Sequence, residues 1–292
     1  MMPEVPDTAC QQSGGARHAP ATIIGMVVLA THEWPPATDA GAGARTPVAV
    51  LVHGVVGWWR TWWRVGPALA ERGWRVIAVD QRGHGHSPRI DGHVSVPELA
   101  ADLGALIETI GAPVDALVGH SLGAAVSAEL AFSRPELMRR LVLEDPPAVT
   151  RADDTDWLAS LDREIVAART EFDAEVAREL ADNPRWLEED ARQDVEGRGL
   201  VDREGILASM SRPTGARVGE IAPALTVPAL YLLAAEDRSV FRGDARRRLE
   251  ATLLANARLA VFESGHVIHR DRFEEYLAAV VDWIEAEARS VG

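Results

Sequence analysis

Three residues of the chain have the types and the order that catalysis by a nucleophilic serine requires. Ser121 stands in the pentapeptide Gly119-His120-Ser121-Leu122-Gly123, and Asp237 and His266 follow it along the chain. A serine hydroxyl is a weak nucleophile at neutral pH and needs a neighbouring base to take its proton. Histidine suits that task because its ordinary pKa is about 6.5, and a carboxylate can orient the imidazole and stabilise its charged form.

The pentapeptide also has the setting of a strained turn between a strand and a helix. It follows the apolar, strand-like run 114–118, and small residues typical of a tightly packed helix come after it. Such a turn holds the serine in an unusual backbone conformation, and only glycine fits at the two flanking positions. The motif alone is weak evidence, so a base, an acid and an oxyanion hole must come from the rest of the chain.

Strands and helices alternate along much of the chain, and the three polar residues each follow a predicted strand. This alternation predicts a mostly parallel sheet covered by helices on both faces, an α/β fold. The carboxyl ends of parallel strands meet at the edge of a sheet where ligands bind. Strands are expected at residues 26–31, 48–52, 74–79, 114–118, 141–143, 228–234 and 258–262, and helices at residues 67–73, 95–110, 244–254 and 271–289.

The alternation stops between residues 151 and 222, where only helical periodicity is present. Trp157, Leu161 and Ile165 share one helical face, and Asn183-Pro184 has the pattern of a cap and first position of a further helix. We therefore expect an all-helical cap over residues 151–222, inserted into a core of residues 22–150 and 223–292. Residues 1–21 have the composition of a disordered tail, and one hypothesis takes Met26 as the natural start.

Composition limits the classes of partner. The chain has 292 residues and a net charge of −14, which argues against binding to nucleic acid or to an anionic membrane surface. It has no apolar run of the roughly 20 residues that a membrane span needs. The single Cys10 excludes an internal disulfide, and no zinc-binding spacing is present. We expect a cytoplasmic monomer or homodimer that acts on a small molecule without a cofactor or a metal.

Taken in order and at strand ends, five motifs of the chain resemble those of α/β-hydrolase-fold serine hydrolases with a helical cap. The resemblance extends over nearly all of residues 26–292. The motifs are His53-Gly54-Val55-Val56-Gly57, Asp80-Gln81-Arg82-Gly83-His84-Gly85-His86-Ser87, Gly119-His120-Ser121-Leu122-Gly123, Ala235-Glu236-Asp237 and Gly265-His266.

The resemblance implies Ser121 as nucleophile, His266 as base and Asp237 as orienting acid. It also implies an oxyanion hole built from the backbone N–H groups of Val55 and Leu122. The chain departs from the family in one place, because Ala234-Ala235 occupy the turn before the acid, where the family usually has glycine.

Several residues have a second interpretation. Glu144 and Asp145 also follow a strand, and in some relatives the acid lies there; Asp237 is preferred because it has the usual position. His269 is interpreted as a structural or rim histidine, since it lacks the preceding glycine of His266. The predicted substrate pocket contains Trp58, Trp59, His120 and Trp157, with some of the neighbouring tryptophans filling the core instead.

Serine at the nucleophile position disfavours the haloalkane dehalogenases and epoxide hydrolases of this fold, which need an aspartate there. The expected reaction is hydrolysis of a carboxylic ester or lactone of a small, largely apolar substrate through an acyl-enzyme. An amidase, a C–C bond hydrolase, a cofactor-free haloperoxidase or perhydrolase, and a non-catalytic ligand receptor of the same fold are the alternatives. Leu122 weakens the haloperoxidase alternative, because those relatives often have methionine there.

Overall fold

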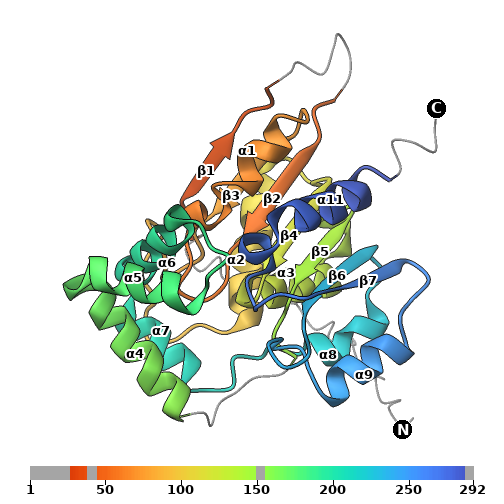
Figure 1. Ribbon diagram of the computed structural model, residues 1–292. Coiled ribbons are helices and arrows are strands. Elements are labelled where there is room, and N and C mark those ends of the chain that lie inside the picture. The colour runs from red at the N-terminus through yellow and green to blue at the C-terminus, as the bar shows by residue number, and fades with distance from the viewer. Residues whose placement is uncertain (1–26, 38–44, 149–154, 287–292) are drawn as a thin grey trace, which may run out of the picture.

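A seven-stranded sheet forms the centre of the computed structural model, which describes residues 27–37, 45–148 and 155–286 (Figure 1). Its strand order is β1-β3-β2-β4-β5-β6-β7, and only β1 runs antiparallel to its neighbour, β3. The expected mostly parallel sheet is therefore confirmed. The strands are β1 (Thr31–Trp34), β2 (Val48–Val52), β3 (Arg75–Val79), β4 (Ala116–His120), β5 (Leu141–Glu144), β6 (Ala229–Ala234) and β7 (Ala257–Phe262).

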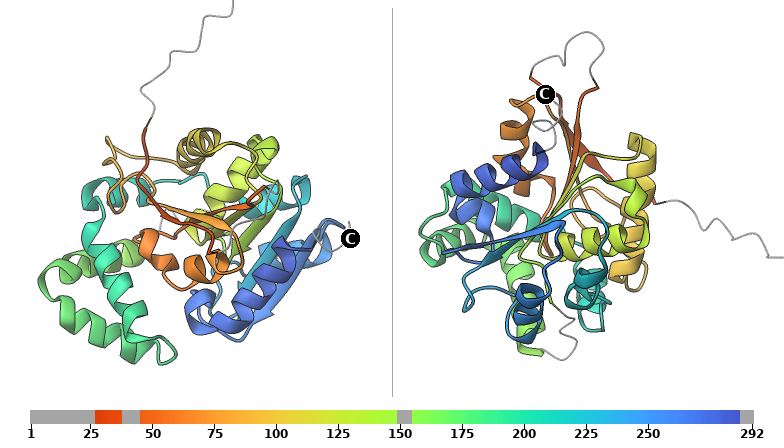
Figure 2. Two further views of the ribbon diagram at one scale, coloured as in Figure 1. Left: turned by 90° about the horizontal axis from the view of Figure 1, so that it is seen from above. Right: turned by 90° about the vertical axis from the view of Figure 1, so that its right-hand side faces the viewer.

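Helices cover both faces of the sheet (Figure 2). The central strands are apolar up to their carboxyl ends, so successive residues such as Val50 and Leu51 are buried on opposite faces. One face packs against α2 (Val96–Ile110), α3 (Leu122–Ser133), α8 (Val218–Ile221) and α9 (Asp244–Ala251), and the other against α1 (Val65–Ala70) and α11 (Phe273–Ile284).

The start of α2 illustrates how local sequence sets an element. Ser95 Oγ accepts a hydrogen bond from the Glu98 N–H at 3.4 Å, and the Glu98 carboxylate accepts one from the Ser95 N–H at 2.8 Å. These reciprocal bonds form a capping box, and Pro97 lies in the first turn of the helix. The helix ends at Gly111, whose φ of 107° suits glycine.

Four of the helices between β5 and β6 gather at one end of the sheet (Figure 1). They are α4 (Thr155–Thr170), α5 (Phe172–Asp182), α6 (Glu188–Leu200) and α7 (Arg203–Met210). The first three enclose a small apolar core of their own, formed by Ala168, Val176, Ala191 and Val195. No strand occurs in residues 155–222, all of which the structure describes.

Several predicted boundaries were wrong by a few residues, and two of them have a clear local cause. The first strand begins at Thr31 rather than at residue 26, because the described residues 27–30 are irregular and Ala30 binds the loop after β3 through the Ser87 hydroxyl and the Asp80 N–H. The helix expected from Pro184 begins at Glu188, since the Trp186 N–H closes a turn onto the Asn183 carbonyl at 2.9 Å.

Some expectations fall on residues outside the described ranges. These are the tail of residues 1–21, the start at Met26 and the first residues of the helical segment, 151–154. Among the helices of the described ranges, none is long and apolar enough to cross a membrane.

Candidate active site

Ser121 occupies a strained turn between β4 and α3, as the pentapeptide predicts. Its φ is 51° and its ψ is −117°, a conformation that side-chain-bearing residues rarely adopt. A Cβ on Gly119 would lie 2.5 Å from the Gly123 carbonyl oxygen, and one on Gly123 would lie 2.2 Å from that of Val52. Both flanking glycines are therefore required by close backbone contact, and the turn holds the hydroxyl at the carboxyl edge of the sheet.

The carboxylate beside His266 is that of Asp145, not of Asp237. Asp145 Oδ2 lies 2.6 Å from His266 Nδ1, and the carboxylate is fully buried at the end of β5. Its Oδ2 also accepts the Val240 N–H at 3.1 Å, and its Oδ1 accepts the Ser239 hydroxyl and the Ala234 N–H. The acid is thus held by four hydrogen bonds, three of them from β6 and the loop that follows it.

The prediction of Asp237 as the orienting acid is corrected by this arrangement. Asp237 is exposed on the loop after β6 and has no hydrogen-bond or ion-pair partner among the described residues. That loop supplies donors from Ser239 and Val240 in place of an acid. The signal in the sequence was the alanine pair in the turn, together with the two adjacent acidic residues at the end of β5.

The predicted oxyanion-hole residues lie beside the serine. Leu122 is the first residue of α3, and the N–H groups of a first helical turn have no acceptor within their helix. Val55 lies in a turn closed by the Gly57 N–H and the Gly54 carbonyl at 3.1 Å. A Cβ on Gly54 would lie 3.1 Å from the Ser121 Cβ, so this turn packs directly against Ser121.

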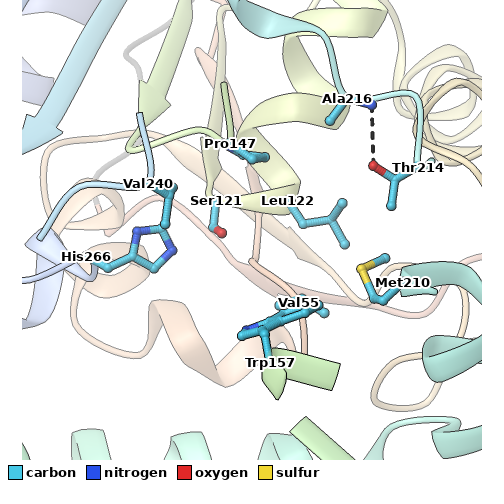
Figure 3. A pocket seen from close by; sticks show the side chains of 10 residues that line it. All are labelled: Val55, Ser121, Leu122, Pro147, Trp157, Met210, Thr214, Ala216, Val240 and His266. Atoms are coloured by element: carbon cyan, nitrogen blue, oxygen red, sulfur yellow. Dashed lines mark hydrogen bonds between the residues drawn. The ribbon is translucent and has the colours of Figure 1, made fainter. Parts of the chain in front are cut away.

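Ser121, His266, Val55 and Leu122 open into one cavity of about 240 Å³ (Figure 3). In Figure 3 the Ser121 hydroxyl lies between the His266 ring and the Leu122 side chain, with Trp157 and Met210 on the opposite wall. The remaining lining residues are Pro147, Thr214, Ala216 and Val240. No Asp, Glu, Lys or Arg is among these lining residues, so the wall around the serine is mostly apolar, with Thr214 and His266 as its polar side chains.

Of the four predicted pocket residues, only Trp157 lines this cavity. Trp58 is buried and donates its indole N–H to the Gln193 carbonyl at 3.2 Å, so its ring packs under α6. Trp59 stacks on the His32 ring at 3.8 Å, near the edge strand. His120 lies beneath the turn, where its ring is 4.7 Å from that of His266. The sequence predicts that these residues lie near the site, but it does not predict which way their side chains point.

Two further histidines are buried behind the oxyanion turn. His53 Nε2 accepts the Gln81 N–H at 3.1 Å, and its Nδ1 donates to the Gly54 carbonyl at 2.7 Å, which fixes a neutral ring. Burial lowers the pKa of His53 to about 4. Burial, with a smaller effect of the neighbouring His53, lowers the pKa of His84 to about 3. Both rings therefore shape the site rather than exchange protons near neutral pH.

Potential metal ligands do not gather at the site or elsewhere in the described ranges, where no three His, Cys, Asp or Glu side chains are grouped to hold an ion.

A family model described as "alpha/beta hydrolase fold" matches residues 47–273. Epoxide hydrolase B of Mycobacterium tuberculosis (strain ATCC 25618 / H37Rv) is 36% identical over 100 residues, which cover 34% of this chain and 28% of that protein.

Other similarities extend over more of the chain. The sn-1-specific diacylglycerol lipase ABHD11 of Xenopus laevis is 25% identical over 82% of this chain and 80% of its own length. The structure of E-2-(acetamidomethylene)succinate hydrolase superposes with a TM-score of 0.73 at 23% identity, covering 89% of this chain and 96% of the other. The enol-lactonase from Burkholderia xenovorans LB400 gives 0.68 at 23% identity, over 88% and 96%. At these identities the two structures establish a shared fold.

Proposed function

The chain belongs to the α/β hydrolase fold family, and from this we propose that it is a serine hydrolase that cleaves a carboxylic ester or lactone of a small, largely apolar substrate. One observation carries the proposal. His266 is held at 2.6 Å by a buried carboxylate and opens, with the strained Ser121, into one apolar cavity. Nucleophile, base and orienting acid are the groups that acyl transfer requires.

In the proposed reaction, Ser121 Oγ attacks the substrate carbonyl carbon while His266 Nε2 takes the hydroxyl proton. Asp145 accepts the Nδ1–H and stabilises the imidazolium that forms. The N–H groups of Val55 and Leu122 bind the oxyanion, and losing one such donor costs about 3 kcal/mol in the transition state. His266 then protonates the leaving alcohol, and a water molecule that it deprotonates hydrolyses the acyl-enzyme and releases the acid.

The lining of the cavity indicates the kind of acyl group. A charged substrate group would lose its hydration against Trp157, Met210 and Pro147 without gaining an ionic partner from the lining residues. A volume of about 240 Å³ lies just below the roughly 300–1,000 Å³ of common ligand pockets. We therefore expect neutral esters and lactones of short to medium size. An epoxide hydrolase that works through a carboxylate nucleophile would need an aspartate in place of Ser121.

The test is hydrolysis of p-nitrophenyl esters of increasing chain length and of simple lactones, with fluorophosphonate labelling in parallel. Ser121→Ala is expected to lower kcat/KM by about 10⁴-fold or more and to abolish labelling. Ser127→Ala is the matched control, since Ser127 is a fully buried serine of the same helix whose hydroxyl has no described partner. Full turnover by Ser121→Ala would refute the proposal.

A further inference from the structure

A second carboxylate–imidazole pair, Glu144 with His269, lies directly behind the catalytic pair. Glu144 and Asp145 are adjacent at the end of β5, and His266 and His269 are three residues apart at the start of α10 (Ile268–Asp271). The Glu144 carboxylate lies 2.8 Å from His269 Nδ1 and also accepts the His269 N–H at 2.9 Å. Both side chains are buried, with exposed fractions of 0% and 2%.

Glu144 also holds the nucleophile. Its backbone carbonyl accepts the N–H of Ser121 at 2.9 Å, across the boundary between β5 and β4. One residue therefore binds the serine through its main chain and the segment that carries His266 through its side chain. The next residue, Asp145, binds His266 itself.

The His120 ring lies between the Asp145–His266 pair and the Glu144–His269 pair. Its ring centre is 4.7 Å from that of His266 and 5.4 Å from that of His269, and its Nε2 lies 3.3 Å from the His266 carbonyl oxygen. Burial holds the pKa of His120 well below its ordinary value, so this ring is a neutral donor to that carbonyl. A displacement of His269 would therefore move both the segment that carries His266 and the His120 ring that contacts His266.

Stability alone is a poor account of the second pair. Burying an ionic or strongly polar pair removes hydration that the pairing only partly replaces. His269 Nε2 and the neighbouring Trp62 Nε1 have no hydrogen-bond partner among the described residues, and each such buried group costs about 1–3 kcal/mol. The arrangement therefore contributes fixed geometry more than net stability.

We propose that Glu144 and His269 are positioning residues for the hydrolysis proposed above, on which this inference rests. Their contacts fix the position of the Ser121 main chain relative to the start of α10. This relative position determines how His266 approaches the serine hydroxyl. Because small displacements of reacting groups have large effects on rate, loosening either residue should lower turnover while leaving the substrate cavity intact.

The test compares Glu144→Gln, His269→Asn and His269→Leu with wild type. Each variant is expected to lower kcat by about 10- to 100-fold with little change in KM. His269→Asn keeps a side-chain donor for Glu144 and should retain more activity than His269→Leu, which keeps none. Asp115→Asn is the matched control, because Asp115 is a largely buried carboxylate paired with Arg45 and Arg139 at the opposite, amino-terminal edge of the sheet.

Two measurements separate positioning from simple destabilisation and from failure of the proposed function. Melting temperatures are recorded for all variants, and rates are measured far below each of them. The rate of fluorophosphonate labelling of Ser121 gives a readout that needs no substrate. Unchanged kcat and labelling in Glu144→Gln and His269→Leu would overturn the positioning role, even if both melt earlier. If wild type labels but no ester or lactone is hydrolysed, the proposed substrate class fails, and the labelling rates still decide the positioning role.

Discussion

Val56, Ser121 and Asp145 are the non-glycine residues with positive φ in the described ranges, and all three lie at the candidate active site. Each conformation costs about 1–3 kcal/mol, and such strain persists only where surrounding contacts hold it. For Ser121 these contacts are the close approaches at Gly119 and Gly123. For Asp145, with a φ of 40°, they are four hydrogen bonds to one carboxylate. Strained backbone is thus found at Ser121 and Asp145, two residues whose side chains the proposed reaction uses.

At this scale the choice between two aspartates can be tested directly. Asp145→Asn is expected to lower kcat by about 10³- to 10⁴-fold, because the amide cannot hold the imidazole in the required tautomer or stabilise its charge. Asp237→Asn, which changes an exposed side chain on the neighbouring loop, should leave kcat and KM unchanged. Steady-state kinetics on one ester decides the matter, and the reverse ranking of the two variants would restore Asp237 as the acid.

At the scale of elements, the sequence predicted most of the sheet and much less of the site's details. β2 and α2 were predictable because apolar runs, caps and terminal glycines act locally. The acid was not, since Asp145 and Asp237 both follow strands. Which one meets His266 depends on the backbone at Asp145 and on donors from the loop after β6. Such tertiary contacts leave no periodic signal.

The helix α6 shows how the inserted helices are attached to the rest of the molecule. Its Asp194 binds Arg270 of α10 at 2.6 Å, and this arginine is 3% exposed. Arg198, also buried, pairs with the same carboxylate and with Glu179. At the end of the preceding turn, the Trp186 indole N–H donates to Asp271 at 3.0 Å. The short helix α10, which follows His266, is therefore bound to the helical insertion through Arg270 and Asp271.

Asp194→Asn is expected to lower the free energy of unfolding by about 3–5 kcal/mol, because it leaves two buried arginines with too little negative charge. Asp173→Asn is the control within the same helices, since Asp173 is 92% exposed and its pairing with Arg192 at 3.8 Å is worth about 0–1 kcal/mol. Urea unfolding measures both. Equal stability of the two variants would show that the buried network does not hold α6 in place.

At the scale of the whole molecule, buried neutral histidines make stability depend on pH. His53 and His84 have pKa values of about 4 and about 3 in the folded chain, whereas the unfolded chain has the ordinary value of about 6.5. Below pH 6.5 these two histidines therefore bind protons in the unfolded state that they do not bind in the folded state. Their stabilisation is complete above that pH and is lost as the pH falls toward 4 and 3.

Each of the two histidines is expected to lower the free energy of unfolding by about 1 kcal/mol between pH 6.5 and pH 5.5. Other groups titrate as well; burial, for example, raises the pKa of Glu179. A comparison with His84→Gln isolates one histidine, and this variant should lose less stability over the same interval. Urea unfolding at several pH values measures the slopes, and parallel slopes for the two proteins would contradict the assignment.

The loop after β6 is a candidate site for engineering. Glu236, Asp237 and Arg238 are exposed, and the carboxylate that contacts His266 lies at the end of the neighbouring strand, β5, instead of in this turn. Exposed turns of this kind tolerate inserted segments. The turn is two residues from Val240, which lines the cavity. It is therefore an attachment point at the rim of the cavity, where a grafted loop could change which molecules enter while Ser121, His266 and Asp145 stay unchanged.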